Sequence, residues 1–255
     1  MPIKTFPWDN KTAFIKQLDD IRRRLIRIAV FLFVLFLICF SLSENILQII
    51  RAPLKDQTLV FLRPTEPFFV HIKLAFFAAL IFSLPFILYH VWELIKPIVR
   101  EKSRSSFLLF LVFALFFFVL GVVFCYFLII PYGIGFLINY KTASLTPRLS
   151  VDYYVTLSLV FLGIFGFVFE LPLIMLFLTK IGIIEPSLLI RYRKYAVLII
   201  FILSAILTPP DVITQLLMGI PLTILYEVGI LLSKAVYRKR QVRINGLPVN
   251  LKTSG

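Results

Sequence analysis

Acidic side chains inside long apolar stretches are the residues of this chain best suited to chemistry. Glu170 is the single charged residue between Tyr153 and Thr179. About 20 apolar residues in a row cross the hydrocarbon core of a bilayer, and a carboxylate near the middle of such a helix costs about 2.5–3.5 kcal/mol. We therefore expect Glu170 to face protein or a water-filled cavity. Pro172 lacks a backbone donor, so we expect a kink where the carboxyl group lies.

Two further polar residues, Gln215 and Glu227, lie in the last apolar stretch, residues 212–233. Glu170 and Glu227 precede the next basic residue of the chain by ten and seven residues. At about 1.5 Å per residue, the two carboxylates lie about 15 Å and 10 Å from the ends of their stretches. Because these depths are similar, we predict one intramembrane polar site formed by Glu170, Gln215 and Glu227.

The composition is that of an integral membrane protein. Apolar residues make up 60% of the 255 residues and charged residues 16%, whereas soluble domains carry about 25% charged residues. Six apolar stretches lie at residues 26–44, 69–92, 107–131, 153–179, 195–207 and 212–233. We predict an all-α integral membrane protein with six transmembrane helices in a single domain, residues 1–240. A polar cytoplasmic tail, residues 241–255, is expected to follow.

The basic residues are distributed unevenly along the chain, which carries a net charge of +14. Of 27 Lys and Arg, 21 lie in the segments 1–27, 96–104, 180–194 and 234–255, and five lie in the alternate connections. An excess of Lys and Arg marks the cytoplasmic loops of membrane proteins. Both termini are therefore expected in the cytoplasm. Membrane orientation and lipid contact account for the charge, and no nucleic-acid partner is expected.

The fifth and sixth helices are expected to be short. Residues 195–207 give about 20 Å of helix, against a hydrocarbon core about 30 Å thick. The turn Thr208-Pro209-Pro210-Asp211 then stops the fifth helix, and Asp211 is placed to cap the sixth. Structural turns or bends are expected at Pro53, Pro85, Pro172, Pro209, Pro210 and Asp211.

Residues 1–25 include a basic amphipathic segment that precedes the first span. Its apolar residues recur at helical spacing, and its basic residues lie largely off that face. We therefore expect a helix at the inner membrane surface. Asp19 and Asp20 are unusual on such a face. Two interpretations remain open: the acids pair with Arg23 or Arg24 one turn on, or they offer a carboxylate to a cationic ligand.

No set of catalytic residues is evident. The sequence has two histidines and lacks a His-Glu-x-x-His zinc motif, a nucleophile motif and a phosphate-binding glycine loop. The two cysteines, Cys39 and Cys125, lie inside apolar stretches without the spacing of metal ligands. We therefore expect no enzymatic activity, no metal site and no cofactor.

Several short motifs occur together in one order. They are Gln17–Leu25 (QLDDIRRRL), Ala52–Leu54 (APL), Pro64–Phe68 (PTEPF), Leu84–Trp92 (LPFILYHVW), Phe165–Pro172 (FGFVFELP) and Leu207–Val212 (LTPPDV). By these motifs the chain resembles the TatC family, the multispanning receptor subunit of twin-arginine protein translocases. The resemblance covers roughly residues 12–240.

The resemblance implies a tilted six-helix cup that binds signal peptides bearing paired arginines. It implies assembly with small single-span subunits into an oligomer that exports folded proteins using the protonmotive force. Signal-peptide contacts are implied at Asp20, Arg22, Glu101 and Ser103. The family's N-terminal acid is usually Glu and is matched here by Asp20, while the usual loop Glu falls on Ser103, two residues after Glu101. Glu170 is expected on the concave face, and helix five is expected to meet the span of a partner.

The main alternative is an ion-coupled secondary transporter with Glu170 and Glu227 as coupling sites. Such carriers tend to have two similar halves, and the lengths of the apolar stretches show no such repeat. A membrane-embedded enzyme is the weaker alternative, for want of a nucleophile or a metal set. The expected location is the bacterial inner membrane, with the thylakoid or mitochondrial inner membrane as the alternative.

Overall fold

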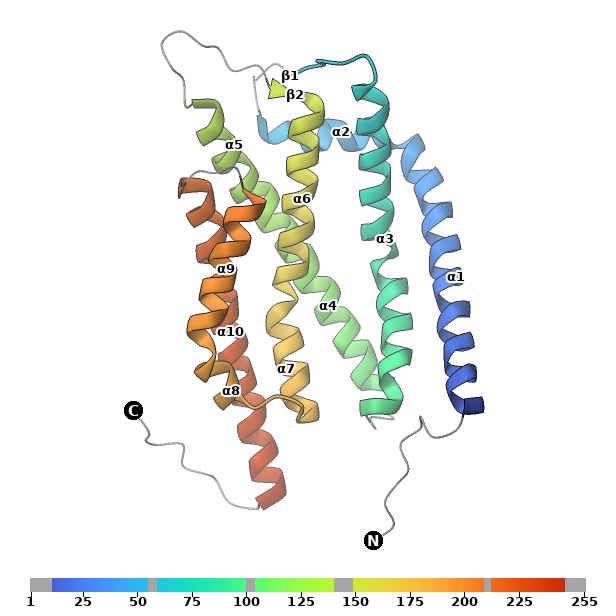
Figure 1. The fold of residues 1–255 in the computed structure, drawn as a ribbon, viewed down its shortest axis with the longest axis vertical. Helices are drawn as coiled ribbons and strands as arrows, with labels where there is room; N and C mark the ends of the chain where they lie inside the picture. Colours follow the sequence, from blue (N-terminus) through green and yellow to red (C-terminus); the bar gives the residue numbers. More distant parts are fainter. Residues whose placement is uncertain (1–10, 55–58, 100–103, 140–148, 209–211, 246–255) are drawn as a thin grey trace.

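Long helices that run up and down make up most of the computed structural model, which describes residues 11–54, 59–99, 104–139, 149–208 and 212–245 (Figure 1). The helices are α1 (Lys11–Ser41), α2 (Ser43–Arg51), a short 3-10 turn η1 (Ala52–Leu54), α3 (Glu66–Val99), α4 (Arg104–Phe124), a π-helical turn η2 (Cys125–Ile129), α5 (Ile130–Asn139), α6 (Val151–Phe169), α7 (Leu171–Ile181), α8 (Pro186–Arg191), α9 (Arg193–Leu207) and α10 (Val212–Asn245). Two short strands, β1 (Leu59–Val60) and β2 (Leu149–Ser150), pair in parallel.

Five helical segments of the described residues are long and apolar enough to cross a membrane. They are Asp19–Ser41, Glu66–Glu93, Leu108–Gly133, Val151–Ile181 and Val212–Arg238. The third segment runs from α4 through η2 into α5, and the fourth joins α6 to α7. α9 has 15 residues, or about 22 Å of helix, and is as short as the sequence predicts. The chain is therefore a multi-pass membrane protein built from helices.

The last helix is not short, which corrects the expectation for the final pair. α10 has 34 residues, and its apolar segment alone has 27. No Gly or Pro occurs between Ser233 and Asn245 to end the helix among the basic residues. The tail expected from residue 241 therefore begins inside α10.

The amphipathic N-terminal segment continues directly into the first span. α1 is one helix from Lys11 to Ser41, and Figure 1 shows it as a single rod. No Gly or Pro occurs in these residues, so nothing interrupts the helical hydrogen bonding. The expectation of a separate helix lying on the membrane surface is therefore wrong for residues 11–25, the part of this segment that the structure describes.

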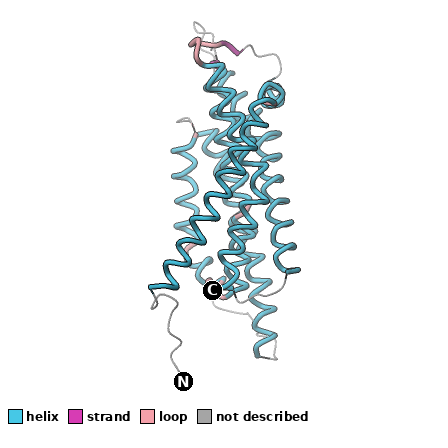
Figure 2. The backbone as a smooth tube through the Cα atoms, turned by 90° about the vertical axis from the view of Figure 1, so that its right-hand side faces the viewer, coloured by secondary structure: helices cyan, strands magenta, loops and turns pink. Residues whose placement is uncertain are grey.

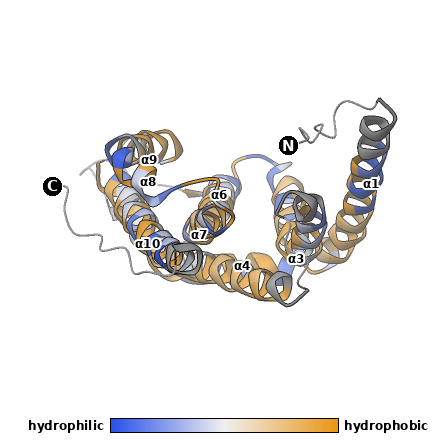
Figure 3. Cartoon of the chain, turned by 90° about the horizontal axis from the view of Figure 1, so that it is seen from below, coloured by the Kyte–Doolittle hydropathy of each residue, from blue (hydrophilic) through white to orange (hydrophobic). Residues whose placement is uncertain are grey.

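α6 and α7 lie at the centre of the arrangement and pack on α3, α4 and α10. Seen from below in Figure 3, α1, α3, α4 and α10 form a curved row, with α6 and α7 on its inner side. α2 lies across one end of the long helices, and the two strands lie at that same end (Figures 1 and 2). The start of α1 and the end of α10 lie at the opposite end (Figure 1). We call these the strand end and the terminal end.

The main hydrophobic core surrounds α6. Its fully buried residues include Val70 and Leu74 of α3, Cys125 of η2, and Tyr154 and Phe165 of α6. Lipid is as apolar as these side chains, so helices in a bilayer associate through close packing and hydrogen bonds rather than through removal from water. The fit between helices therefore decides how stable this fold is.

Two tyrosines hold α2 across the strand end, and the buried one is expected to matter more. The Tyr154 hydroxyl donates to the Ile50 carbonyl at 2.6 Å in a buried setting, and the Tyr126 hydroxyl donates to the Ile49 carbonyl at 2.7 Å in an exposed one. We expect Tyr154→Phe to cost about 1–3 kcal/mol, because it leaves a buried carbonyl without its donor. Tyr126→Phe should cost less, since the Ile49 carbonyl still accepts from the Ala52 N–H. Thermal unfolding of both variants in detergent checks this, and equal losses would contradict it.

Candidate functional site

The helix that carries Glu170 is interrupted at that residue. α6 ends at Phe169 and α7 begins at Leu171. The Glu170 N–H donates to the Phe167 carbonyl, three residues back, at 3.1 Å, and helical bonding resumes where Ile174 donates to the Glu170 carbonyl at 2.9 Å. Pro172, at the start of α7, has no N–H to give the turn before it. The interruption therefore coincides with Glu170, the carboxylate in the interior of the span.

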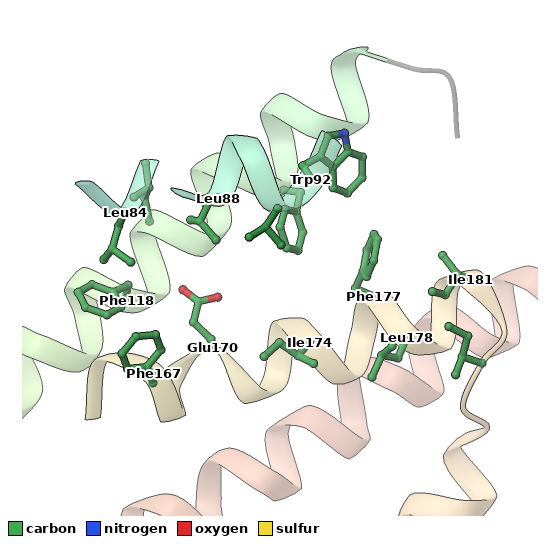
Figure 4. Close-up of a pocket in the computed structure, with 14 residues that line it drawn as sticks. Leu84, Leu88, Trp92, Phe118, Phe167, Glu170, Ile174, Phe177, Leu178 and Ile181 are labelled. Atoms are coloured by element: carbon green, nitrogen blue, oxygen red, sulfur yellow. The ribbon is translucent and has the colours of Figure 1, made fainter. Parts of the chain in front are cut away.

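The Glu170 side chain points into an apolar pocket of about 450 Å³ between α3, α4 and α7 (Figure 4). Figure 4 shows the carboxylate directed between Leu88 and Phe118. The pocket is lined by Leu84, Leu88, Val91, Trp92, Phe110, Leu115, Phe118, Phe167, Glu170, Ile174, Phe177, Leu178, Ile181 and Ile183. Glu170 is the only charged residue among them.

This pocket suits a ligand that is apolar along its length and carries one hydrogen-bond donor or one positive charge. Ionised acceptors form the stronger class of hydrogen bonds, and low local dielectric strengthens such bonds further. The same surroundings make an unpaired carboxylate costly. Glu170 can therefore select one polar group at a fixed depth, while the apolar lining accepts the rest of the ligand.

The structure does not bring Gln215 and Glu227 to Glu170. The Glu227 carboxylate is ion-paired with Arg193 of α9, and the Gln215 amide donates to the Phe201 carbonyl of α9 at 3.1 Å. Neither residue lines the pocket of Glu170. Both join α9 to α10, so the predicted three-residue polar site is not formed in the described part of the chain.

Asp20 and Arg22 lie exposed near the start of α1. Arg24, one of the two arginines expected as partners of the N-terminal acids, is instead ion-paired with Glu93 of α3. Glu101 and Ser103 lie outside the described residues. So do Pro209, Pro210 and Asp211, whereas Pro53 lies in η1, and α3 runs without a break through Pro85.

Sequence reasoning missed the contact between α1 and α3. Arg24 donates to one oxygen of Glu93, and the Tyr89 hydroxyl donates to the other at 3.1 Å. Arg24 and Glu93 are 69 residues apart, and helical periodicity carries no information over that separation. One signal was available in the sequence. Both residues flank apolar stretches on the side expected to face the cytoplasm, so they lie at the same depth relative to the membrane.

A second pocket, lined by several polar side chains, lies at the strand end and has a volume of about 580 Å³. There Lys73 does not simply extend to water, as its place near the end of a span suggests. Its ammonium donates to Asp152 at 2.6 Å and to the Thr156 hydroxyl at 2.9 Å. The buried Glu66 carboxylate accepts from the Leu62 N–H and the Ser150 hydroxyl, both at 3.1 Å. These bonds join the connection before α3 to the connection before α6. Among the described residues, no group of three side chains is placed to bind a metal ion.

Comparison with known proteins places this geometry in one family. Residues 16–221 match the sequence profile of TatC, described as Sec-independent protein translocase protein. The protein of that name from Campylobacter jejuni is 37% identical over 227 residues, which are 86% of this chain and 93% of that protein. Its counterpart from Aquifex aeolicus is 35% identical over 232 residues, 89% of this chain and 96% of that protein.

A solved structure agrees with the sequence comparison. A crystal structure of the twin-arginine translocase receptor TatC superimposes with a TM-score of 0.78 at 36% identity, covering 87% of this chain and 99% of that one. The family match and the structural match each cover most of the chain. The chain belongs to the TatC family of Sec-independent protein translocase proteins.

Proposed function

We propose that this chain is the receptor subunit of a twin-arginine translocase. It binds signal peptides with paired arginines and assembles with small single-span subunits into an oligomer that exports folded proteins on the protonmotive force. The observation that supports this most is the likeness to the TatC receptor structure, which extends over 87% of this chain and 99% of that one. The bacterial relatives support the bacterial inner membrane as its location.

The proposed topology has six crossings, with both termini in the cytoplasm. Basic residues lie in the first half of α1 and near the ends of α7 and α10, and these ends lie together at the terminal end (Figure 1). That distribution supports a cytoplasmic terminal end by the positive-inside rule. α9 is then the fifth crossing, and the bilayer thins around it because about 22 Å of helix must span it.

The proposed peptide site lies at this terminal end. Asp20 is exposed on α1, and Arg24, one turn further along, pairs with Glu93. A free carboxylate accepts a guanidinium through two parallel hydrogen bonds, which makes it selective for arginine over lysine. Arg22, Glu101 and Ser103 complete the proposed site.

The pocket of Glu170 is proposed to receive an apolar segment from the signal peptide or from a partner subunit. The alternative of an ion-coupled carrier relied on Glu170 and Glu227 acting together. Glu227 is ion-paired with Arg193, and Glu170 opens into a different space. The receptor is therefore the better supported of the two functions.

Peptide binding tests the proposed function directly. The full chain in lipid nanodiscs is titrated with a fluorescent signal peptide carrying Arg-Arg, and with the same peptide carrying Lys-Lys. We expect saturable one-to-one binding that is at least about tenfold tighter for Arg-Arg, since lysine cannot reproduce the bidentate contact. Equal binding of both peptides, or solute flux through the protein in liposomes without any peptide, would contradict a receptor.

Asp20→Asn should weaken Arg-Arg binding about 10- to 100-fold, because hydrogen bonds to charged groups contribute about 1.5–3 kcal/mol. Asp19→Asn is the matched control, since Asp19 is the neighbouring exposed acid and is not assigned to the site. Asp20→Glu should retain most of the affinity. Unchanged binding by Asp20→Asn would remove Asp20 from the site.

A further inference from the structure

Glu93 lies at the terminal end, and its carboxylate accepts hydrogen bonds from side chains rather than from the backbone of a helix. It lies at the end of the second membrane segment, and its side chain is 36% exposed. One of its oxygens accepts from the Arg24 guanidinium of α1, and the other accepts from the Tyr89 hydroxyl one turn earlier on α3. A carboxylate has about four lone-pair positions, so Glu93 can accept further donors from the exposed side.

Asp20 is placed to act together with this carboxylate. Asp20 and Arg24 are four residues apart, so they lie on the same face of α1, one turn from each other. Because Arg24 contacts Glu93, that face of α1 is turned towards α3. One acid on each of two neighbouring helices therefore lies on the side where α1 and α3 meet, and Arg23 and Arg27 of α1 are exposed nearby.

We propose that Glu93 is a further carboxylate for the paired arginines of a signal peptide, beside Asp20, and that Arg24 occupies it in the free protein. This inference rests on the proposed function and deepens it. Neighbouring side chains of an extended peptide point to opposite sides. Two consecutive arginines thus reach two separate acids, one arginine contacting Asp20 on α1 and the other Glu93 on α3.

Replacing Arg24 by an arginine of the peptide leaves the charge beside Glu93 unchanged. An arginine of the peptide takes the place of Arg24, which is itself a guanidinium with the same hydrogen-bonding geometry. Arg24 is a long, flexible side chain at the water-facing end of its helix and can turn to solvent. The Tyr89 hydroxyl continues to hold one carboxylate oxygen, so Glu93 stays oriented while its partner changes. Because the exposed arginines of α1 repel a doubly charged peptide, a carboxylate in direct contact is needed for binding.

The test separates this role from a merely structural one, in which the ion pair only fixes α1 on α3. Glu93→Gln and Arg24→Gln both remove that ion pair. A structural role predicts that both variants lose the same affinity for the Arg-Arg peptide. The proposal predicts opposite results: Glu93→Gln weakens binding at least about tenfold, and Arg24→Gln binds as well as the unaltered chain or better, because its carboxylate is no longer occupied.

The measurement is the same nanodisc titration, with thermal unfolding of each variant recorded alongside. Glu93→Asp keeps the charge and should recover part of the affinity. If Glu93→Gln does not fold, Arg24→Gln still distinguishes the two roles. A purely structural role predicts that this variant binds the Arg-Arg peptide more weakly, whereas the proposal predicts undiminished affinity. Failure of the unaltered chain to distinguish Arg-Arg from Lys-Lys overturns the proposed function. Normal discrimination by Glu93→Gln overturns only the role of Glu93.

Discussion

Replacing Glu170 by Leu should strongly reduce export while leaving the protein at least as stable as the unaltered chain. The side chain lies in a pocket whose other 13 lining residues carry no charge. A carboxylate without a charged partner is costly in apolar surroundings, so the variant should unfold at the same or a higher temperature. Transport should fall by at least about tenfold, since the loss of one charge-assisted hydrogen bond corresponds to about 1.5–3 kcal/mol.

Two readouts on the same preparations check this expectation. One is export of a folded reporter with an Arg-Arg signal, in cells where this chain replaces the resident receptor. The other is the unfolding temperature of the purified protein. Glu44→Gln, an exposed acid on α2 at the strand end, is the control and should change neither. A marked loss of stability in Glu170→Leu, or normal export by it, would contradict a functional role for the carboxylate in this pocket.

Gly121→Ala should be among the most destabilising single substitutions in the membrane core. A Cβ atom at Gly121 of α4 would lie 2.5 Å from the Phe165 carbonyl oxygen and 2.9 Å from the Phe169 side chain, both of α6. A backbone oxygen cannot move without moving its helix, so α4 and α6 must separate. Overpacking typically costs about 1–3 kcal/mol and occasionally more, and the loss here outweighs the gain of about 1 kcal/mol that Gly→Ala brings to a helix.

Gly135→Ala is the matched control for this prediction. A Cβ atom at Gly135 meets nothing within 4 Å, so only the helix-propensity term remains, and the variant should be as stable as the unaltered chain or more so. Gly166→Ala should fall between the two, because its Cβ would meet the Phe118 ring at 2.6 Å, and a ring can turn aside. Unfolding temperatures in one detergent should therefore rank Gly135→Ala above Gly166→Ala and Gly166→Ala above Gly121→Ala. A different order would show that the contact between α4 and α6 is not the limiting one.

The features that the sequence predicts well are those with a local cause. Glu170 and Pro172 are two residues apart: the cost of a carboxylate in an apolar helix predicts a protected side chain, and the missing N–H of the proline predicts a break beside it. The short α9 follows from the same kind of argument, since the number of apolar residues before the Thr208-Pro209 turn sets its length. The helical, multi-pass character of the chain follows from composition.

The features that the sequence does not predict depend on direction around a helix or on distant partners. Glu170 and Glu227 lie at similar depths, yet depth says nothing about which neighbour each faces, and Glu227 pairs with Arg193 on α9. The ion pair of Arg24 with Glu93 joins residues too far apart for any periodic signal. The apolar stretch at residues 212–233 underestimates α10, because arginine and lysine are good helix formers and the helix continues through the basic residues after it.

Site-specific cross-linking tests the central claim most directly, namely that acids at the terminal end hold the paired arginines. A photoreactive residue replaces Arg23, exposed beside Asp20, or Phe61, exposed at the strand end, and each variant in nanodiscs is illuminated with the Arg-Arg peptide. The account predicts strong cross-linking from position 23, weak cross-linking from position 61, and loss of the position 23 product with the Lys-Lys peptide. Equal products from both positions, or a position 23 product that is the same for both peptides, would contradict it.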